Sequence, residues 1–166
     1  SITFNISFRD SIGNTGTAIT DTTDGTNVTT DTTAPTLSNV SIASDNSTST
    51  LAKDGDEITL TFTASEAIST PVVTFQSGGA AITDGSIVYN NTSGNTWTAI
   101  YTANASDTDG AVSYSIAFSD TAGNAGSAVT SGSGSVTTDT TAPTLSNVSI
   151  ASDNSTSTLA KAGDDV

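Results

Sequence analysis

The side chains of this sequence that could do chemistry are almost all carboxylates. Asp and Glu together number 17, against 3 for Lys and Arg, and the formal net charge is −14 at pH 7. Carboxylates suit a divalent cation, above all Ca²⁺, which takes six to eight oxygen ligands that different loops can supply. The alternative is that the acids serve solubility, because a strongly negative surface keeps a protein dispersed.

The residue types that are missing exclude several other functions. The sequence has no Cys and no His, so it offers no thiolate nucleophile, no imidazole base and no ordinary zinc site. It shows no nucleophile–base pair, and we expect no enzymatic activity. So few basic residues cannot form a surface for nucleic acid or anionic lipid. No apolar run reaches the ~20 residues that span a bilayer, so we expect no membrane insertion of this segment.

The elements that must position these acids are predicted to be β-strands. Residues 58–64 alternate Ile, Leu, Phe and Ala with threonine, and residues 112–118 alternate large apolar residues with Ser and Ala. This period of two indicates half-buried strands. We expect no helix, and strands near residues 36–43, 57–65, 71–76, 86–90, 96–103, 112–119 and 126–138, the last of them interrupted. About seven short strands in about 100 residues predict an all-β, immunoglobulin-like antiparallel β-sandwich.

The single tryptophan, Trp97, shares one strand face with Ala99 and Tyr101. We therefore predict that it lies in the core, because the alternation places it in register with two apolar side chains. The alternative is an exposed aromatic platform on which a sugar stacks.

The sequence also repeats itself. The stretch DTTAPTLSNVSIASDNSTSTLAK occurs at 31–53 and again, unchanged, at 139–161, which is 108 positions later. A looser match joins FRDSIGNTG (8–16) to FSDTAGNAG (118–126). A period this long indicates a tandem array of domains. We predict that 28–138 is one complete repeat, that 1–27 holds the C-terminal strands of a preceding repeat, and that 139–166 holds the N-terminal strand of a following one.

Four motifs, taken in order, resemble a known family. DTTAPT, GDEITLTFTASEA, NTWTAIYT and FSDTAGNAG together look like the bacterial immunoglobulin-like repeats found in tandem in giant surface adhesins and related cell-surface proteins. The resemblance covers essentially the whole chain. It implies an extracellular or cell-surface stalk of many similar sandwiches, usually calcium-dependent, that carries a binding tip away from the cell.

A sandwich of this kind would gather the acids at its two ends. Successive strands run in opposite directions, so alternate loops return to the N-terminal pole, where the chain enters, or to the C-terminal pole, where it leaves. The N-terminal pole is predicted to hold Asp31, Glu66 and Asp120. The C-terminal pole is predicted to hold Asp54, Asp56, Glu57, Asp107, Asp109 and Asp139, while Asp45 and Asp84 fall in turns of their own.

In a tandem array the C-terminal pole of one unit faces the N-terminal pole of the next. Two acidic surfaces would then repel each other. Our candidate Ca²⁺ ligands are Asp31, Glu66, Asp120, Asp54, Asp56, Asp107, Asp109 and Asp139. The alternative is that acids simply favour loops, where polar turn residues belong. We find no candidate catalytic residue.

Three functions fit these features. The first is a structural extender in the stalk of a long extracellular or cell-surface protein, with calcium-stiffened linkers and neighbouring repeats of the same chain as partners. The second is a glycan- or protein-binding module. The third is a subunit of a self-assembling surface filament, joined head to tail.

Overall fold

The computed structural model describes residues 1–83 and 85–166, and its regular elements are all strands. Asp84 and the turn expected around it lie outside the described residues. The strands are β1 (Leu37–Ser44), β2 (Leu51–Ala52), β3 (Glu57–Ala64), β4 (Val72–Ser77), β5 (Ala80–Ala81), β6 (Val88–Ser93), β7 (Thr96–Thr102), β8 (Gly110–Ala117) and β9 (Thr137–Thr138). In the part described, no helix has the length and apolar character needed to cross a membrane.

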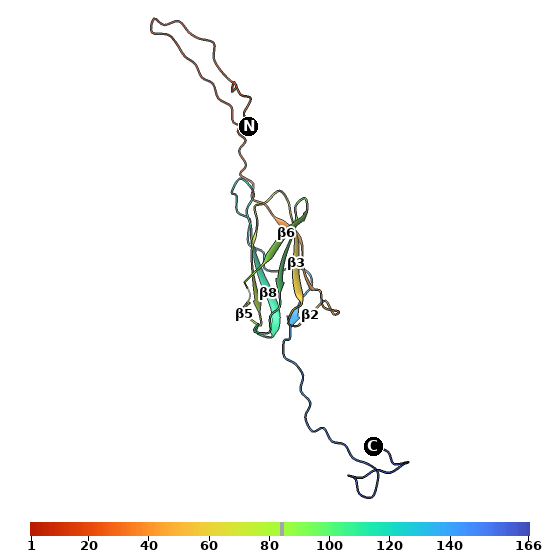
Figure 1. Cartoon of the computed structure of the whole chain (residues 1–166). Helices are drawn as coiled ribbons and strands as arrows, with labels where there is room; N and C mark the ends of the chain where they lie inside the picture. The colour runs from red at the N-terminus through yellow and green to blue at the C-terminus, as the bar shows by residue number, and fades with distance from the viewer. Residues whose placement is uncertain (84) are drawn as a thin grey trace.

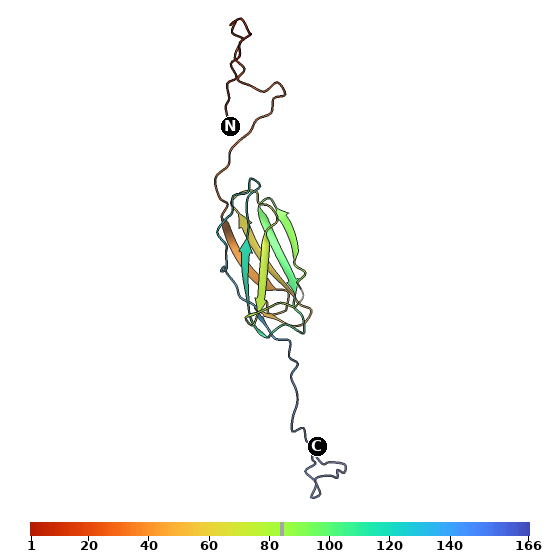
Figure 2. The same cartoon turned by 90° about the vertical axis from the view of Figure 1, so that its left-hand side faces the viewer.

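The strands form two sheets that pack face to face (Figures 1 and 2). One sheet has the order β1-β3-β7-β6 and the other the order β2-β9-β8-β4-β5. Neighbouring strands are antiparallel, except that β2 and β9 run parallel. The predicted all-β class and the two-layer architecture are thus confirmed.

The core lies between the sheets and follows from the alternation of the strands. In β3, Ile58, Leu60 and Phe62 have no exposed surface, while the threonines between them are partly exposed. Tyr101 of β7 is 1 % exposed, and its ring centroid lies 4.8 Å from that of Phe75. Burial of each such side chain stabilises the fold by about 1.5–3 kcal/mol relative to leaving it in water.

Trp97 lies where the alternation predicts. It is partly buried and packs against the core cluster. Its partner in the β3–β7 register is the fully buried Phe62.

The last predicted strand, 126–138, is regular only over β9. Before β9 the chain makes isolated bridges, among them Ile116 with Val129 and Ser41 with Ser133. The reason is the close approach of this segment to β1. A Cβ at Gly134, where φ is +76°, would lie 2.2 Å from the carbonyl oxygen of Ile42. Only glycine accepts both that backbone angle and that contact. The two-residue strands β2 and β5 were not predicted.

The segments on either side of the sandwich keep their apolar side chains exposed. Ile6 is 55 % exposed, whereas Ile116, which like Ile6 stands two residues before a copy of the motif, is fully buried. Ile150 is 84 % exposed, against 5 % for Ile42. The two segments leave the sandwich at opposite ends (Figure 1).

Two loops nevertheless form the same hydrogen bonds in both of their copies. The Asp120 carboxylate accepts from the backbone amide and the side-chain amide of Asn124, and Asp10 does the same with Asn14. The loop 44–57 and its copy 152–165 also share their internal bonds. These loops form without a sandwich around them, so their local sequence determines their shape.

The first prediction concerns Gly126, which follows the Asp120 turn. A Cβ at this position would lie 2.2 Å from the ring of Phe118 and 2.8 Å from the carbonyl oxygen of Pro35. We expect Gly126→Ala to lower the free energy of unfolding by about 1–3 kcal/mol, as overpacking does. Gly85→Ala, with nothing within 4 Å of its Cβ, is the matched control. Equal denaturation midpoints of the two variants would show that this contact is unimportant.

Candidate functional site

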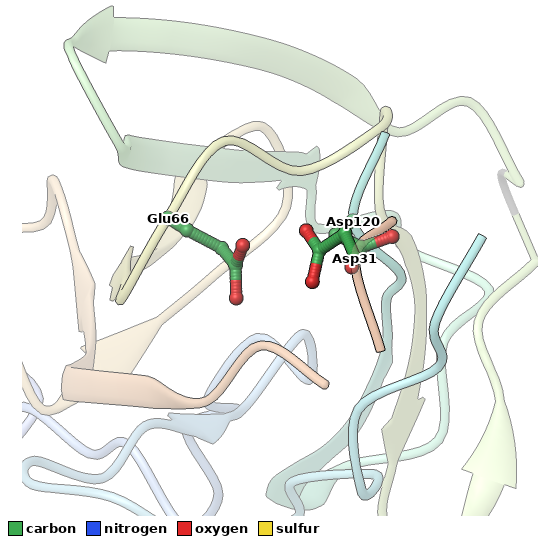
Figure 3. A group of neighbouring side chains, drawn as sticks. All are labelled: Asp31, Glu66 and Asp120. Atoms are coloured by element: carbon green, nitrogen blue, oxygen red, sulfur yellow. The ribbon is translucent and has the colours of Figure 1, made fainter. Parts of the chain in front are cut away.

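Three carboxylates from separate segments meet at the N-terminal pole of the sandwich. Asp31 precedes β1, Glu66 follows β3, and Asp120 follows β8. One ligand oxygen of each lies within 4.8 Å of the others. Figure 3 shows Glu66 reaching from its own loop toward Asp120 and Asp31. These are the three acids that strand direction predicted for this pole, and we call them the acidic triad.

Asp120 is the fixed member of the acidic triad. Its side chain is buried in a tight turn, where Oδ1 accepts hydrogen bonds from the amides of Gly123 at 2.6 Å and Asn124 at 2.8 Å. The side-chain amide of Asn124 donates to Oδ2 at 2.7 Å. These bonds, that from the Asn124 side chain above all, lower the pKa of Asp120 and keep it ionised.

Asp31 and Glu66 are brought to Asp120 by contacts of their neighbours. The side-chain amide of Asn124 donates to the backbone carbonyl of Asp31 at 3.2 Å. Beside Glu66, the amide of Ser65 donates to the carbonyl of Thr36 at 2.9 Å, and the Ser65 hydroxyl accepts from the amide of Thr36 at 3.0 Å. Within the part of the chain that the structure describes, the carboxylate of Glu66 has no hydrogen bond or ion pair.

The charges of the acidic triad are not neutralised by either lysine. Lys53 is ion-paired with Asp56, and Lys161 with Asp164, both outside the triad. Two unit charges ~4 Å apart interact by about 4 kcal/mol near a protein surface, so three such carboxylates repel one another appreciably. Hard oxygen donors of this kind favour Ca²⁺ or Mg²⁺. The triad could therefore hold a metal ion.

The acids predicted for the C-terminal pole do not gather in this way. Over the described residues, the only group of three or more metal-ligating side chains this close together is the acidic triad. The other candidate ligands accept hydrogen bonds from their own loop or from a neighbouring segment. Asp107, only 6 % exposed, accepts from the amides of Thr83 and Asn104 and from the Thr83 hydroxyl.

The other four candidate ligands of that pole are similar. Asp56 accepts from the Asn46 side chain and from both the amide and the ammonium group of Lys53. Asp54 accepts from the amide of Ala105, and Asp139 from that of Thr141. Asp109 accepts from Thr140 and Thr141. The structure therefore gives these carboxylates roles in shaping loops.

Residues that support the triad were not singled out from the sequence. Asn124 holds both Asp120 and Asp31, Ser65 fixes the loop of Glu66, and Gly126 lets the turn approach Pro35. The sequence did contain a signal for Asn124 and Gly126. The motifs FRDSIGNTG and FSDTAGNAG have the Asp, both glycines and the Asn at the same positions. Nothing comparable marks Ser65.

Comparisons of this chain with protein family models, with curated proteins and with solved structures find no match. What the chain does must therefore be argued from its own residues.

The second prediction concerns Asp56. Hydrogen bonds from the side chains of Asn46 and Lys53 lower its pKa from 3.8 to about 2. A carboxyl whose folded pKa is depressed stabilises the fold above its unfolded pKa, and this contribution is lost as the pH falls through the folded value. We expect a carbon-detected NMR titration of Asp56 to have its midpoint near pH 2, and the loop 44–57 to loosen between pH 3.8 and 2.

Asn46→Ala should move the midpoint of Asp56 upward, because the largest cause of its low pKa is then removed. Asn90→Ala, on β6 and two strands away from β3 in the same sheet, should leave it unchanged. A wild-type midpoint near 3.8 would contradict the hydrogen-bonded loop described here.

Proposed function

We propose that this chain is a structural extender from the stalk of a long extracellular or cell-surface protein, built from tandem immunoglobulin-like units. The observation that carries the proposal is that one identical segment stands at both ends of the sandwich. The residues DTTAPT lead into β1 as 31–36 and lead out of β9 as 139–144. The two copies lie at opposite poles (Figure 2), so units joined through this segment would follow one another end to end.

The sheet order supports an immunoglobulin-like unit. In the constant-type immunoglobulin sandwich, strands A, B, E and D form one sheet and strands G, F and C the other. Here β1-β3-β7-β6 faces β9-β8-β4, which is the same arrangement in chain order. The short β2 pairs parallel with β9, so the first strand is split between the sheets.

The exposed apolar side chains of the flanks support the same proposal. Ile6 and Ile150 match residues that are buried in the sandwich, and the same surroundings would bury them in neighbouring units. An isolated hairpin, by contrast, is marginally stable in water.

Calcium at the acidic triad would couple each unit to the one before it. Asp31 belongs to the linker, while Glu66 and Asp120 belong to the sandwich that follows. An ion held by all three would fix the linker to that sandwich and replace their repulsion with shared ligation. Extracellular calcium modules bind at about 10⁻⁴–10⁻³ M, so such a site would be filled outside a cell and empty at cytosolic levels.

The third prediction tests the triad with Glu66→Gln. This variant removes one charge without breaking any hydrogen bond among the described residues. We expect calcium at a hundredfold excess over its dissociation constant to stabilise the wild-type chain by about 2.7 kcal/mol relative to chelator. Glu66→Gln should lose most of that gain. The matched control is Glu57→Gln, because Glu57 is the other glutamate of the chain and begins β3 at the opposite pole.

Calorimetry and thermal melts of the three proteins make the measurement. Equal melting temperatures in calcium and chelator, with no heat of binding, would show that the acids serve solubility alone. An equal loss of calcium stabilisation in Glu66→Gln and Glu57→Gln would show that calcium binds elsewhere than in the triad.

The fourth prediction concerns shape. A strand of seven residues spans about 23 Å, so each unit with its loops and linker should add roughly 40 Å to a chain of several units. Small-angle scattering of a protein with three complete units in calcium should report a rod. A compact particle would contradict an extender. If the length of particles formed by the single chain grows with protein concentration, the chains join head to tail and the filament is favoured.

A further inference from the structure

The two copies of the linker show two different halves of its contacts. We call DTTAPT, at 31–36 and 139–144, the linker. The copy 139–144 follows β9 and contacts the sandwich before it. The copy 31–36 precedes β1 and contacts the sandwich after it. Because the sequences are identical, both sets of contacts are available to any linker that stands between two complete units.

The contacts with the preceding sandwich depend on Asp109. Its Oδ1 accepts hydrogen bonds from the amide of Thr140 at 2.7 Å and from the Thr140 hydroxyl at 2.9 Å. Its Oδ2 accepts from the Thr141 hydroxyl at 2.7 Å. Just before these residues, the amide of Asp139 donates to the carbonyl of Ala52 at 2.9 Å.

The contacts with the following sandwich involve the other end of the linker. Pro35 is fully buried, and its carbonyl lies against Gly126. Thr36 exchanges hydrogen bonds with Ser65, and the carbonyl of Asp31 accepts from Asn124. Neither Thr32 nor Ala34 has a hydrogen bond or ion pair among the described residues.

We propose that the C-terminal pole is a docking surface for the linker, with Asp109 as its positioning residue, and that one linker is held by both consecutive units without any metal ion. This inference rests on the tandem arrangement proposed above. Position by position, the preceding unit holds the first three linker residues and the following unit holds the first and the last two. Among the described residues, the alanine is the one linker position that has neither a hydrogen bond nor a buried side chain in either copy.

Such a linker leaves little freedom between the units. Thr141 and Pro143 are two residues apart, so their Cα atoms can be no more than about 7.6 Å from each other. Proline fixes its own φ and restricts the alanine before it to extended geometry. The two units would then meet at a defined angle. About one linker residue, the alanine, would lie between the part held by the preceding unit and the part held by the following unit.

Asp109 in this role acts without calcium, because it lies outside the acidic triad. Both of its oxygens already accept hydrogen bonds, and these bonds, the Thr140 amide first, lower its pKa and hold it as the carboxylate. We call the hydrogen bonds from Thr140 and Thr141 to Asp109 the clamp. The clamp at the C-terminal pole and the acidic triad at the N-terminal pole therefore act on the same linker by different means. Removing the Asp109 carboxylate should leave the acidic triad in place, and removing a carboxylate of the triad should leave the Asp109 hydrogen bonds in place.

The test uses the full chain in chelator and compares equivalent amides of the two linker copies. Thr140 is bonded to Asp109, whereas Thr32, at the same position of the other copy, has no partner in the described structure. We expect the Thr140 amide to exchange about tenfold more slowly than that of Thr32, which is the order of one net hydrogen bond. Its ¹⁵N relaxation should also report a rigid backbone.

Asp109→Ala should abolish this difference while the melting temperature of the sandwich stays the same. Asp54→Ala removes a carboxylate of the same pole that bonds Ala105 rather than the linker, and it should preserve the difference. Equal exchange of Thr32 and Thr140 in the wild-type chain would overturn the proposal. Protection that persists in Asp109→Ala, or that arises only with calcium, would overturn it as well.

These outcomes are distinct from those that test the proposed function. A mobile Thr140 in chelator together with a rod in calcium would refute the clamp and keep the extender. A rigid Thr140 in a compact three-unit protein would refute the extender and keep the clamp as a feature of this linker.

Discussion

The structure depends on the burial of one alternating face of each strand, because this burial decides where every charge can lie. Ile58, Leu60 and Phe62 are fully buried, and the threonines between them form the outward face of β3. A charged side chain inside would pay a large desolvation cost. With the exception of Glu57, at the first residue of β3, the described acids lie outside the strands. The sandwich therefore concentrates charge at its two poles.

This constraint explains why much could be predicted from sequence. The period of two located the longer strands, and their alternating directions brought Asp31, Glu66 and Asp120 to one pole although they are far apart in the chain. The prediction needed only the number and order of strands. It needed no knowledge of side-chain packing, because a loop's pole depends on topology alone.

What could not be predicted depends on local backbone geometry. The pattern gave no reason for β9 to be only two residues long, since the glycines before it matter through their close approach to β1. Nor did it separate carboxylates that shape loops from those free to bind an ion. Asp107 and Glu66 are both loop acids, yet the first accepts three hydrogen bonds and the second none among the described residues. That difference arises from where loop amides point.

The two poles therefore deal with negative charge in different ways, and this difference bears on how units could join. A carboxylate that accepts several amide hydrogen bonds is stabilised in its charged form without a cation. Asp109 is of this kind, because hydrogen bonds from Thr140 and Thr141 lower its pKa. In the acidic triad, the carboxylate of Asp120 accepts three hydrogen bonds, that of Asp31 accepts one, and that of Glu66 accepts none among the described residues. In the proposed tandem array, a cation at the triad would relieve the repulsion among its carboxylates and also fix the linker, because Asp31 belongs to both the linker and the triad.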